Sequence, residues 1–514
     1  MDMKKPNLIV IMTDQQRFDT IAAHGHPHMI TPNLDRFARL GVSFSQAYCP
    51  GATCVASRAA VFTGMYPHNT GVYSFGHWAH QRSWVHDLTA AGYHAVNIGK
   101  MHISPRDERM GFHERVIVEN PTSDFLRNSG VDDDWGKLLS LHGRSRPLNR
   151  HRTDPQWRDK LQGIPWSMEE ELHPDVFVAD AAIGWIERHQ PVRPVLLQIG
   201  FTGPHEPYDP LPRHLELYRE RDVPLPVWRE GELESKPPQH LAHQDFNNRF
   251  DHESQIAMPD ATDEQLVEMR RHYYAKVTTV DEQLGRIMTK LEEKGYLEHA
   301  LVLMMSDHGD MLGDHRLPYK WLMYDSVVRV PFLVWDRRRK EGAREERQFS
   351  WSSEQREPAT ALVHEKLVSL MDVGPTLLEA AGVAVPSYLE GRSLLGLLEG
   401  REEIDRPYVY CEDNYLTMVR SATHKLVHYT GQEEQGELYD LTDDPHELYN
   451  RFDDANYEEV KRKLQAALLQ WLLQSTYRTA AYKTRQPGAP QLMPQQLKYL
   501  HPAPLYNPSG WMER

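Results

Sequence analysis

Four largely apolar runs, each followed by polar residues, constrain the fold of this chain most strongly. Runs of this kind are typical of strands buried on both faces, as in a parallel sheet covered by helices. The segments between them are predicted to be helices, the longest with the three-and-four apolar spacing of one buried face. The strands are expected at 7–12, 93–99, 194–201 and 301–305, and the helices at 32–41, 85–91, 176–188 and 263–294. This alternation predicts an α/β fold with a large mixed, mostly parallel sheet sandwiched by helices.

The chain is too long for a single core, so we expect a large domain and a smaller one. Residues 1–345 are assigned to the N-terminal α/β domain. It carries polar, irregular insertions at about 103–170 and 208–260, which are too long to be simple connections and are expected to cover a site. Residues 346–478 are predicted to form an α+β subdomain with an antiparallel sheet, whose first part can still pack on the main sheet.

The smaller domain is predicted from short strands between two helices. The helices are expected at 367–381 and 457–474. The strands are expected at 408–410, 417–420, 424–429 and 437–440. Residues 479–514 are Pro-rich with scattered aromatic side chains and cannot form a core. We expect them to form an extended tail on this or a neighbouring subunit, and therefore expect a homo-oligomer.

The charge and the cysteine content limit which binding partners and which cellular compartment are expected. A formal net charge of −15 argues against nucleic acid and against an anionic membrane surface as partners. The three cysteines, Cys49, Cys54 and Cys411, form no paired framework, which indicates a reducing compartment. The first apolar run is interrupted at Thr13-Asp14, so it is neither a signal peptide nor a membrane span. A cytoplasmic protein is expected.

Polar side chains gather where the predicted strands end. They are Asp14 and Gln15, Lys100 and His102, His205, and Asp307 and His308, with Lys320 further along the chain. The carboxyl ends of parallel strands meet at the edge where open α/β sheets bind ligands. The carboxylates, the amide and His308 can hold one divalent cation. In an extended segment Lys100 and His102 point the same way, so that together they can grip an oxyanion and move a proton.

The stretch Cys54-Val55-Ala56-Ser57-Arg58 follows a loop rich in small and polar residues. A short helix is expected from Ser57 to about Gly64. Cys54 would then lie near a helix N-terminus, which favours negative charge, and Arg58 would follow one turn later. The residues alone support either a thiolate next to a cation or an ordinary buried cysteine.

Taken together, these motifs resemble the sulfatase family of the alkaline-phosphatase-like superfamily over nearly the whole chain. The landmarks are Cys54-Val55-Ala56-Ser57-Arg58 with Thr63-Gly64, Gly99-Lys100-Met101-His102, Pro204-His205, Ser306-Asp307-His308-Gly309, and Glu437-Leu438-Tyr439-Asp440 with Asp444-Pro445. The resemblance implies that a formylglycine-generating or sulfatase-maturating enzyme oxidises Cys54 to formylglycine. The hydrate of that aldehyde would be the nucleophile. The substrate would be a small anionic sulfate ester, cleaved to an alcohol and sulfate.

The resemblance also implies roles for the basic residues. Arg58 would stabilise the aldehyde hydrate, and Lys100 and Lys320 would hold sulfate oxygens. His205 would protonate the leaving oxygen, and His102 would accept the second proton.

A single divalent cation is implied as the cofactor, acting as a Lewis acid. Its ligands would be Asp14, Gln15, the modified residue at position 54, Asp307 and His308. Oxygen ligands favour Ca²⁺, and the nitrogen of His308 leaves Mn²⁺ or Mg²⁺ open.

Two departures from the family pattern keep an alternative open. Ala56 stands where the motif usually has Pro, and Asp14-Gln15 stands where many sulfatases have paired aspartates. The Asp-Gln and Asp-His pairing also occurs in the branch nearer to choline sulfatases and phosphonate monoester hydrolases. A phosphonate monoester or phosphodiester hydrolase is therefore the second hypothesis, while the pair Lys100 and His102 favours sulfate esters.

Overall fold

The computed structural model describes residues 5–74, 76–120, 132–147, 150–249, 258–338, 350–352, 361–401, 405–432 and 434–483. Their strands form an eight-stranded sheet and a four-stranded sheet. In spatial order the larger sheet contains β4 (Glu114–Ile117), β3 (His94–Gly99), β5 (Val195–Pro204), β1 (Asn7–Asp14), β6 (Ala300–Ser306), β7 (Phe332–Asp336), β2 (Val42–Tyr48) and β8 (Leu362–Ser369). Of these strands only β7 runs antiparallel to its neighbours, which confirms a large mixed, mostly parallel sheet.

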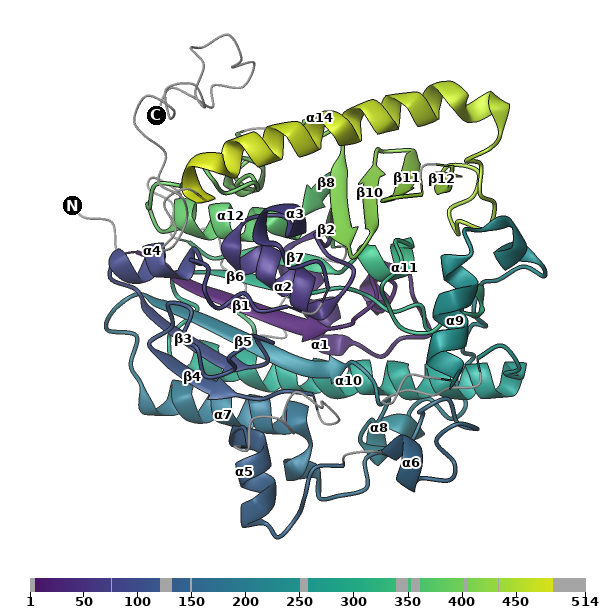
Figure 1. The fold of residues 1–514 in the computed structure, drawn as a ribbon. Helices are drawn as coiled ribbons and strands as arrows, with labels where there is room; N and C mark the ends of the chain where they lie inside the picture. The colour runs from purple at the N-terminus through teal and green to yellow at the C-terminus, as the bar shows by residue number, and fades with distance from the viewer. Residues whose placement is uncertain are drawn as a thin grey trace, which may run out of the picture.

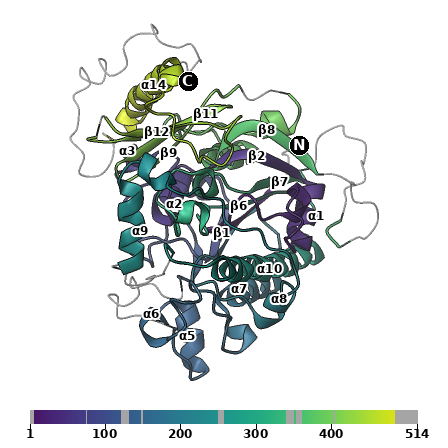
Figure 2. The same cartoon turned by 90° about the vertical axis from the view of Figure 1, so that its right-hand side faces the viewer.

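Helices cover both faces of the larger sheet (Figure 1). The described α-helices are α1 (Pro32–Leu40), α2 (Cys54–Thr63), α3 (Pro67–Thr70), α4 (Val85–Ala90), α5 (Asp134–Leu141), α6 (Arg150–Thr153), α7 (Pro174–Arg188), α8 (Pro212–Glu216), α9 (Gln239–Arg249), α10 (Asp263–Glu293), α11 (Asp325–Val328), α12 (Val373–Ala380), α13 (Leu395–Leu398) and α14 (Glu458–Lys483). Helices α7 and α10 lie on one side of the sheet, and α2 and α12 lie on the other (Figures 1 and 2). Within the described ranges, no helix combines the length and the apolar character needed to cross a bilayer.

The central strand β1 shows why its sequence is uniformly apolar. Leu8 and Val10 belong to the core shared with α2 and α12, whereas Ile9 and Ile11 belong to the core shared with α7 and α10. Successive side chains of a strand point to opposite faces, so a strand covered on both sides needs apolar residues at every position. The polar residues Thr13 and Asp14 therefore lie at the carboxyl end of β1, at the edge of the sheet.

The smaller sheet is antiparallel throughout, as predicted for the C-terminal region. Its strands, in spatial order, are β12 (Gly436–Asp440), β11 (His424–Tyr429), β10 (Leu416–Arg420) and β9 (Val409–Asp413). The long helix α14 packs across it and contributes Leu464 and Leu468 to their common core. In Figure 1 this helix spans the top of the molecule.

The predicted helix at 367–381 is wrong at its beginning. Leu367 and Val368 end strand β8, which pairs in parallel with β2 in the larger sheet. Ser369 then begins a short 3-10 turn (Leu370–Asp372) whose N-terminus it caps, and α12 follows. The apolar run suits either structure, and pairing with β2 decides it. A strand from the range 346–478 thus completes the larger sheet.

The insertions contain more regular structure than their sequences indicated. The segment 103–170 contributes β4 to the edge of the larger sheet and carries α5 and α6, while 208–260 carries α8 and α9. At the C-terminal end, α14 continues to Lys483, so the first residues assigned to the extended tail are helical. The rest of that tail, 484–514, lies outside the described residues.

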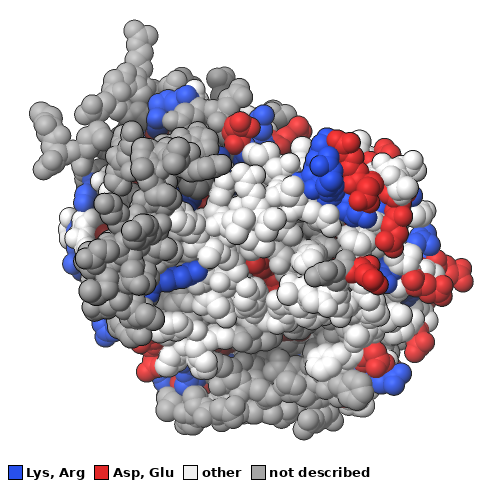
Figure 3. All heavy atoms as spheres, turned by 45° about the horizontal axis from the view of Figure 1, so that its top comes forward, with Lys and Arg blue, Asp and Glu red and all other residues white. Residues whose placement is uncertain are grey.

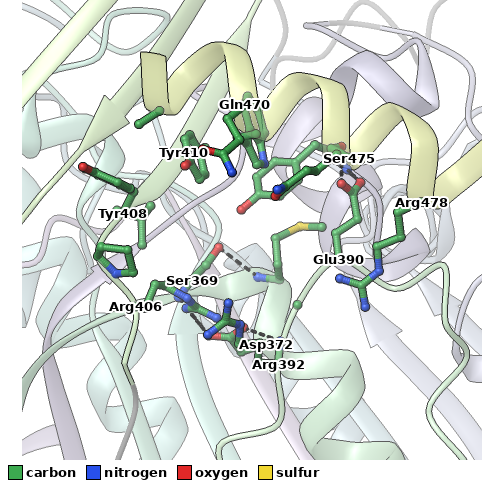
Figure 4. A pocket seen from close by; sticks show the side chains of 18 residues that line it. Ser369, Asp372, Glu390, Arg392, Arg406, Tyr408, Tyr410, Gln470, Ser475 and Arg478 are labelled. Carbon is green, nitrogen blue, oxygen red and sulfur yellow. Dashed lines mark hydrogen bonds and ion pairs between the residues drawn. The ribbon is translucent and has the colours of Figure 1, made fainter. Parts of the chain in front are cut away.

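A cavity of about 280 Å³ lies where α14 passes over the ends of β8 and β9 (Figure 4). At its floor Arg406 donates to both carboxylate oxygens of Asp372, at 2.6 and 2.7 Å. The Trp471 ring of α14 also lines the cavity and stacks on Tyr410, with centroids 4.2 Å apart. None of the predicted site residues lines this cavity in the described part of the chain. The stacked rings instead join α14 to β9 of the smaller sheet.

One face of the molecule carries charged side chains of both signs. On the face shown in Figure 3, the visible Lys and Arg side chains are interspersed with Asp and Glu, and a broad uncharged area lies between them. A continuous basic surface of the kind that binds a nucleic acid backbone is not seen on that part of the face.

Candidate active site

The predicted site residues meet at the carboxyl edge of the larger sheet. Strands β3, β5, β1 and β6 are neighbours in that order, so the residues that follow them converge. The side chains of Lys100, His205, Asp14 and Asp307 are all buried there. Helix α2 reaches the same edge through hydrogen bonds of its Ser57 and Arg58 side chains to Asp307. This is the position at which open α/β sheets bind their ligands.

Cys54 is the first residue of α2, so the helix begins three residues earlier than the sequence indicated. Its side chain is buried, with 1% of the residue exposed. Thr53 stands at the N-cap in an extended conformation, but its hydroxyl donates to Asp413 at 2.7 Å instead of capping the helix. The positive end of the helix dipole therefore faces position 54, which favours an oxyanion there.

Arg58 is fully buried and organises the two acids of the site. Its Nε donates to Asp307 Oδ2 at 2.7 Å, and its Nη2 lies 3.5 Å from Asp14 Oδ2. Its Nη1 donates to the backbone carbonyl of Lys100 at 2.9 Å. Burial alone would lower the pKa of Arg58, but Asp307 and Asp14 raise it above the ordinary value. One guanidinium thus fixes the ends of three strands relative to α2.

Asp14, Asp307 and His308 form a buried group that suits a divalent cation. Their ligand atoms all lie within 4.8 Å of one another, and His308 Nε2 lies 3.8 Å from Asp14 Oδ1 and from Asp307 Oδ1. His308 Nδ1 bonds to the carbonyl of Gly309 at 2.8 Å, which makes Nδ1 the donor and leaves the Nε2 lone pair pointing toward the carboxylates.

Two atoms of this group lack hydrogen-bond partners within the described residues. They are Asp14 Oδ1 and His308 Nε2. Buried polar atoms are nearly always satisfied, so an unpaired carboxylate oxygen facing an unpaired imidazole lone pair indicates a missing electrophile. Two carboxylates and an imidazole nitrogen are ligands that Ca²⁺, Mn²⁺ or Mg²⁺ can accept.

The charge of Asp14 is held in place by the cations around it. Burial alone would raise the pKa of Asp14, but Lys100, His205, Arg58 and Lys320 together hold that pKa well below its ordinary value. Lys100 Nζ forms an ion pair with Asp14 Oδ2 and donates to a residue from the first insertion, Asn120, at 2.7 Å. Asp14 is therefore ionised at neutral pH, as a metal ligand must be.

Gln15 lies beside the acidic group, but its amide is already engaged. Lys320 donates to its Oε1 at 2.6 Å, and its Nε2 donates to Glu206 Oε2 at 2.6 Å and to Asp310 Oδ2 at 2.7 Å. An aspartate at this position would face two further carboxylates, which explains physically why an amide stands here. To bind a cation, Oε1 would have to exchange Lys320 for the metal.

His205 is neutral in this arrangement. Its Nδ1 bonds to the Glu206 carbonyl at 2.7 Å, so its Nε2 accepts from Lys320 Nζ at 2.7 Å. Burial and then Lys320 lower the pKa of His205 well below its ordinary value. Acidic neighbours have the opposite effect on Lys320, because Glu206, Asp14 and Asp307 outweigh burial and raise its pKa. The Lys320–His205 pair thus shares one proton, which resides on the lysine.

His102 does not follow an extended segment, contrary to the argument from alternation. Strand β3 ends at Gly99, which has a φ of +100°, and His102 has a φ of +54°. The backbone therefore turns between Lys100 and His102. The two remain electrostatic neighbours, because burial and then the Lys100 charge lower the pKa of His102 to about 4.

Sequence reasoning missed several groups at the site. Glu206 and Asp310 are adjacent to predicted residues, and only their contacts with Gln15 reveal them. Asn120 comes from the first insertion and Asp413 from the end of β9 in the smaller sheet. Burial raises the pKa of Asp413 well above its ordinary value, and Cys54 is among the groups that contribute. No local pattern links these last two residues to the strand ends.

The fold places the chain in a known structural class. The solved phosphonate monoester hydrolase of Agrobacterium radiobacter superposes with a TM-score of 0.72 at 23% identity, over 92% of this chain and 96% of that one. The fold is therefore alkaline-phosphatase-like.

Sequence comparison identifies the family. The sulfatase family model matches residues 6–383, and the model for the C-terminal region of N-sulphoglucosamine sulphohydrolase matches residues 354–474. An arylsulfatase of Clostridium perfringens is 29% identical over 88% of this chain and 92% of its own length. A choline-sulfatase of Rhizobium meliloti is 26% identical over 87% and 82%. The chain belongs to the sulfatase family, whose enzymes hydrolyse sulfate esters.

Proposed function

We propose that the protein cleaves an organic sulfate monoester to an alcohol and sulfate, using formylglycine at position 54 and one divalent cation. The observation that carries this proposal is the position of residue 54. It begins α2 at the edge of the sheet where Asp14, Asp307 and His308 meet and where Lys100 and Lys320 converge. Formylglycine supplies a hydrated aldehyde as nucleophile, and the cation supplies Lewis acidity. The chain's own residues supply charge, orientation and proton transfer.

The two lysines suit the binding of a sulfate group. Lys100 forms an ion pair with Asp14, and both Lys100 and Lys320 contribute to lowering the pKa of Asp14. Each ammonium can donate to an oxygen of a tetrahedral anion while keeping one protein contact. Arg58 acts differently from the role implied by the resemblance, because its guanidinium is occupied by Asp307, Asp14 and a backbone carbonyl. In our proposal it positions the acids and supports position 54 indirectly.

The leaving oxygen is expected to receive its proton from the Lys320–His205 pair. His205 Nε2 accepts from Lys320 at 2.7 Å, and Lys320 and Lys100 contribute to keeping its pKa low. A bound sulfate ester places negative charge against both lysines and so offsets that field. The imidazole can then take the shared proton and pass it to the departing alcohol.

His102 is assigned the opposite role, that of proton acceptor, and this assignment predicts the pH dependence. Because its pKa is lowered to about 4, His102 is neutral and able to accept a proton at pH values above about 4. The acid limb of kcat/KM should therefore lie near pH 4, well below the pH of about 6.5 expected for an ordinary histidine. His102→Gln should lower kcat by about 10²-fold or more and remove that limb. Rate measurements from about pH 3 to 8 check this, and an unchanged profile in the variant would rule out His102 as the base.

Maturation of Cys54 requires access that the folded chain does not give. With 1% of Cys54 exposed, a formylglycine-generating or sulfatase-maturating enzyme would have to act before folding is complete. Recognition would also have to tolerate Ala56. A homo-oligomeric state and a cytoplasmic location stay predictions from the sequence.

A phosphonate monoester or phosphodiester hydrolase is the second candidate, supported by the Asp14-Gln15 and Asp307-His308 pairs. Purified protein should be assayed with an aryl sulfate and the matching aryl phosphonate monoester. We expect kcat/KM to be larger for the sulfate by about tenfold or more, which corresponds to ~1.4 kcal/mol of transition-state discrimination. A larger value for the phosphonate would overturn the first proposal in favour of the second.

A further inference from the structure

The loop that follows β5, residues 205–209, carries the proposed proton donor His205. Pro204 and Pro207 lack a backbone N–H, so fewer carbonyls of this loop can be satisfied within the loop itself. The carbonyls of His205 and Pro207 instead accept from Lys276 Nζ, each at 2.8 Å. Lys276 belongs to α10, the long helix that packs against β5 (Figure 1). One side chain of α10 therefore holds this loop at two points.

The Lys276 ammonium is fully used by these contacts and one more. Its third bond is an ion pair with Asp209 Oδ1 at 2.7 Å, at the end of the same loop. Lys276 is 1% exposed and Asp209 is fully buried. An ammonium has three protons to donate, and the loop accepts all three. Any effect of Lys276 on the reaction must therefore pass through the loop and not through direct contact with a substrate.

The two carbonyls held by Lys276 lie on either side of Glu206 in the chain. The Glu206 carbonyl, between them, bonds to His205 Nδ1 at 2.7 Å. This bond fixes the orientation of the imidazole, so that His205 Nε2 faces Lys320 Nζ at 2.7 Å. If the loop moved, the Glu206 carbonyl and the ring that it orients would move with it. A misplacement of about 1 Å at a reacting group can lower a rate by about 10²-fold.

The same face of α10 also holds the residue that binds Lys320. Tyr273 precedes Lys276 by three residues, so the two side chains are neighbours on the helix surface. The Tyr273 hydroxyl donates to the backbone carbonyl of Gln15 at 2.7 Å. The side-chain oxygen of Gln15 in turn accepts from Lys320 at 2.6 Å. Helix α10 thus positions both members of the Lys320–His205 pair.

We infer that Lys276 is a positioning residue for protonation of the leaving alcohol. It fixes the loop 205–209 so that His205 Nε2 can take a proton from Lys320 and pass it to the departing oxygen. The inference rests on the proposed function. The alternative is a purely structural lysine, whose ion pair with Asp209 only holds α10 against the loop. A structural lysine affects all substrates alike, whereas a positioning lysine matters most for substrates whose leaving oxygen needs a proton.

Two substrates that differ in their leaving group separate these readings. p-Nitrophenol is a stronger acid than phenol, so p-nitrophenyl sulfate needs little protonation on cleavage and phenyl sulfate needs more. Lys276→Met keeps the length of the side chain and removes the ammonium. In the full-length protein it should lower kcat/KM for phenyl sulfate by about 10²-fold and that for p-nitrophenyl sulfate by about threefold or less. Steady-state kinetics with both esters measure this difference in selectivity.

A double-mutant cycle tests whether Lys276 acts through His205. His205→Gln removes the proton donor and should itself lower kcat/KM more for phenyl sulfate than for p-nitrophenyl sulfate. Adding Lys276→Met to His205→Gln should then leave the ratio of the two kcat/KM values unchanged, because the positioned group is already absent.

Lys236 offers a matched control. It is also a buried lysine, and its Nζ donates to the Tyr439 hydroxyl at 2.9 Å and to the Glu447 carbonyl at 2.5 Å. These bonds join the second insertion to the C-terminal region. Lys236→Met should lower the melting temperature and change kcat/KM for the two esters by the same factor.

Equal losses for the two esters in Lys276→Met would overturn the inference and leave Lys276 a structural residue. A further change in the ratio when Lys276→Met is added to His205→Gln would also overturn it. If loss of the buried cation keeps Lys276→Met from folding, Lys276→Met combined with Asp209→Asn removes both charges of the ion pair and is judged by the same two outcomes. Failure of the proposed function is distinct, because the unmodified chain would then hydrolyse neither ester.

Discussion

Replacing Cys54 by alanine is expected to lower kcat for an aryl sulfate by about 10⁴-fold or more, the scale seen when a catalytic nucleophile is removed. Alanine cannot be converted to formylglycine, so the site loses its nucleophile while keeping its surroundings. The backbone bonds that position α2, such as Ser57 N–H to the Thr53 carbonyl at 2.9 Å, do not involve the thiol. The folded structure should therefore persist. Steady-state kinetics and thermal unfolding of the two proteins check the prediction.

A second substitution at the same position tests the chemistry more closely. A serine hydroxyl can attack sulfur but has no second oxygen on the same carbon with which to expel sulfate. The Cys54→Ser variant should therefore accumulate one sulfate group on the peptide that contains position 54, visible by mass spectrometry, and release alcohol in a single burst. Cys411→Ala removes another fully buried thiol that no site contact uses, and it should keep near-normal turnover. Near-normal rates in Cys54→Ala would contradict the proposed mechanism.

Strand β1 illustrates how much of the fold could be predicted from the sequence. Successive residues of β1 belong to two different cores. The apolar run therefore follows directly from burial of the strand on both faces. Similar apolar runs predicted strands β3, β5 and β6. They therefore also predicted the edge of the larger sheet at which the candidate site lies. The prediction failed where an apolar run suits either a strand or a helix, as at Leu367 and Val368. There, pairing with β2 outweighs the helical continuation into α12.

Some residues of the candidate site could likewise be predicted from the sequence, and others could not. Residues that follow buried strands, such as Asp14, His205 and Asp307, could be predicted because parallel strands bring their ends together. Asp413 could not, since it depends on how the smaller sheet docks against the loop before α2. The sequence also did not show that the side chains of Gln15 and Arg58 bind fixed partners. Residue type alone does not reveal which neighbour a side chain contacts. In the mechanism proposed above, these contacts make Arg58 a positioning residue, and its role stays a prediction.

Removing the Asp307 carboxylate should affect both activity and metal-linked stability. Asp307 Oδ1 faces His308 Nε2 at 3.8 Å, and its Oδ2 accepts from Arg58 at 2.7 Å. Asp307→Ala deletes one ligand of the cation and leaves the buried guanidinium without its closest partner, which costs about 3–5 kcal/mol of unfolding free energy where no substitute is found. Arg58 keeps Asp14 at 3.5 Å, so the variant should fold at reduced stability. Turnover should fall by about 10³-fold or more.

Metal addition separates these two consequences. A cation that binds only the folded chain stabilises it by about 2.7 kcal/mol at a concentration 100 times its Kd. Adding Ca²⁺, Mn²⁺ or Mg²⁺ to metal-stripped protein should therefore raise the melting temperature of the unmodified chain and leave that of Asp307→Ala unchanged. Asp325→Ala is the matched control, because Asp325 is a buried carboxylate paired with Lys425 and lies outside the acidic triad. It should lose stability and yet retain the metal-dependent rise and most of its turnover. A rise of the same size in Asp307→Ala would show that Asp307 is not a ligand, and the cation would then have to be placed elsewhere in the site.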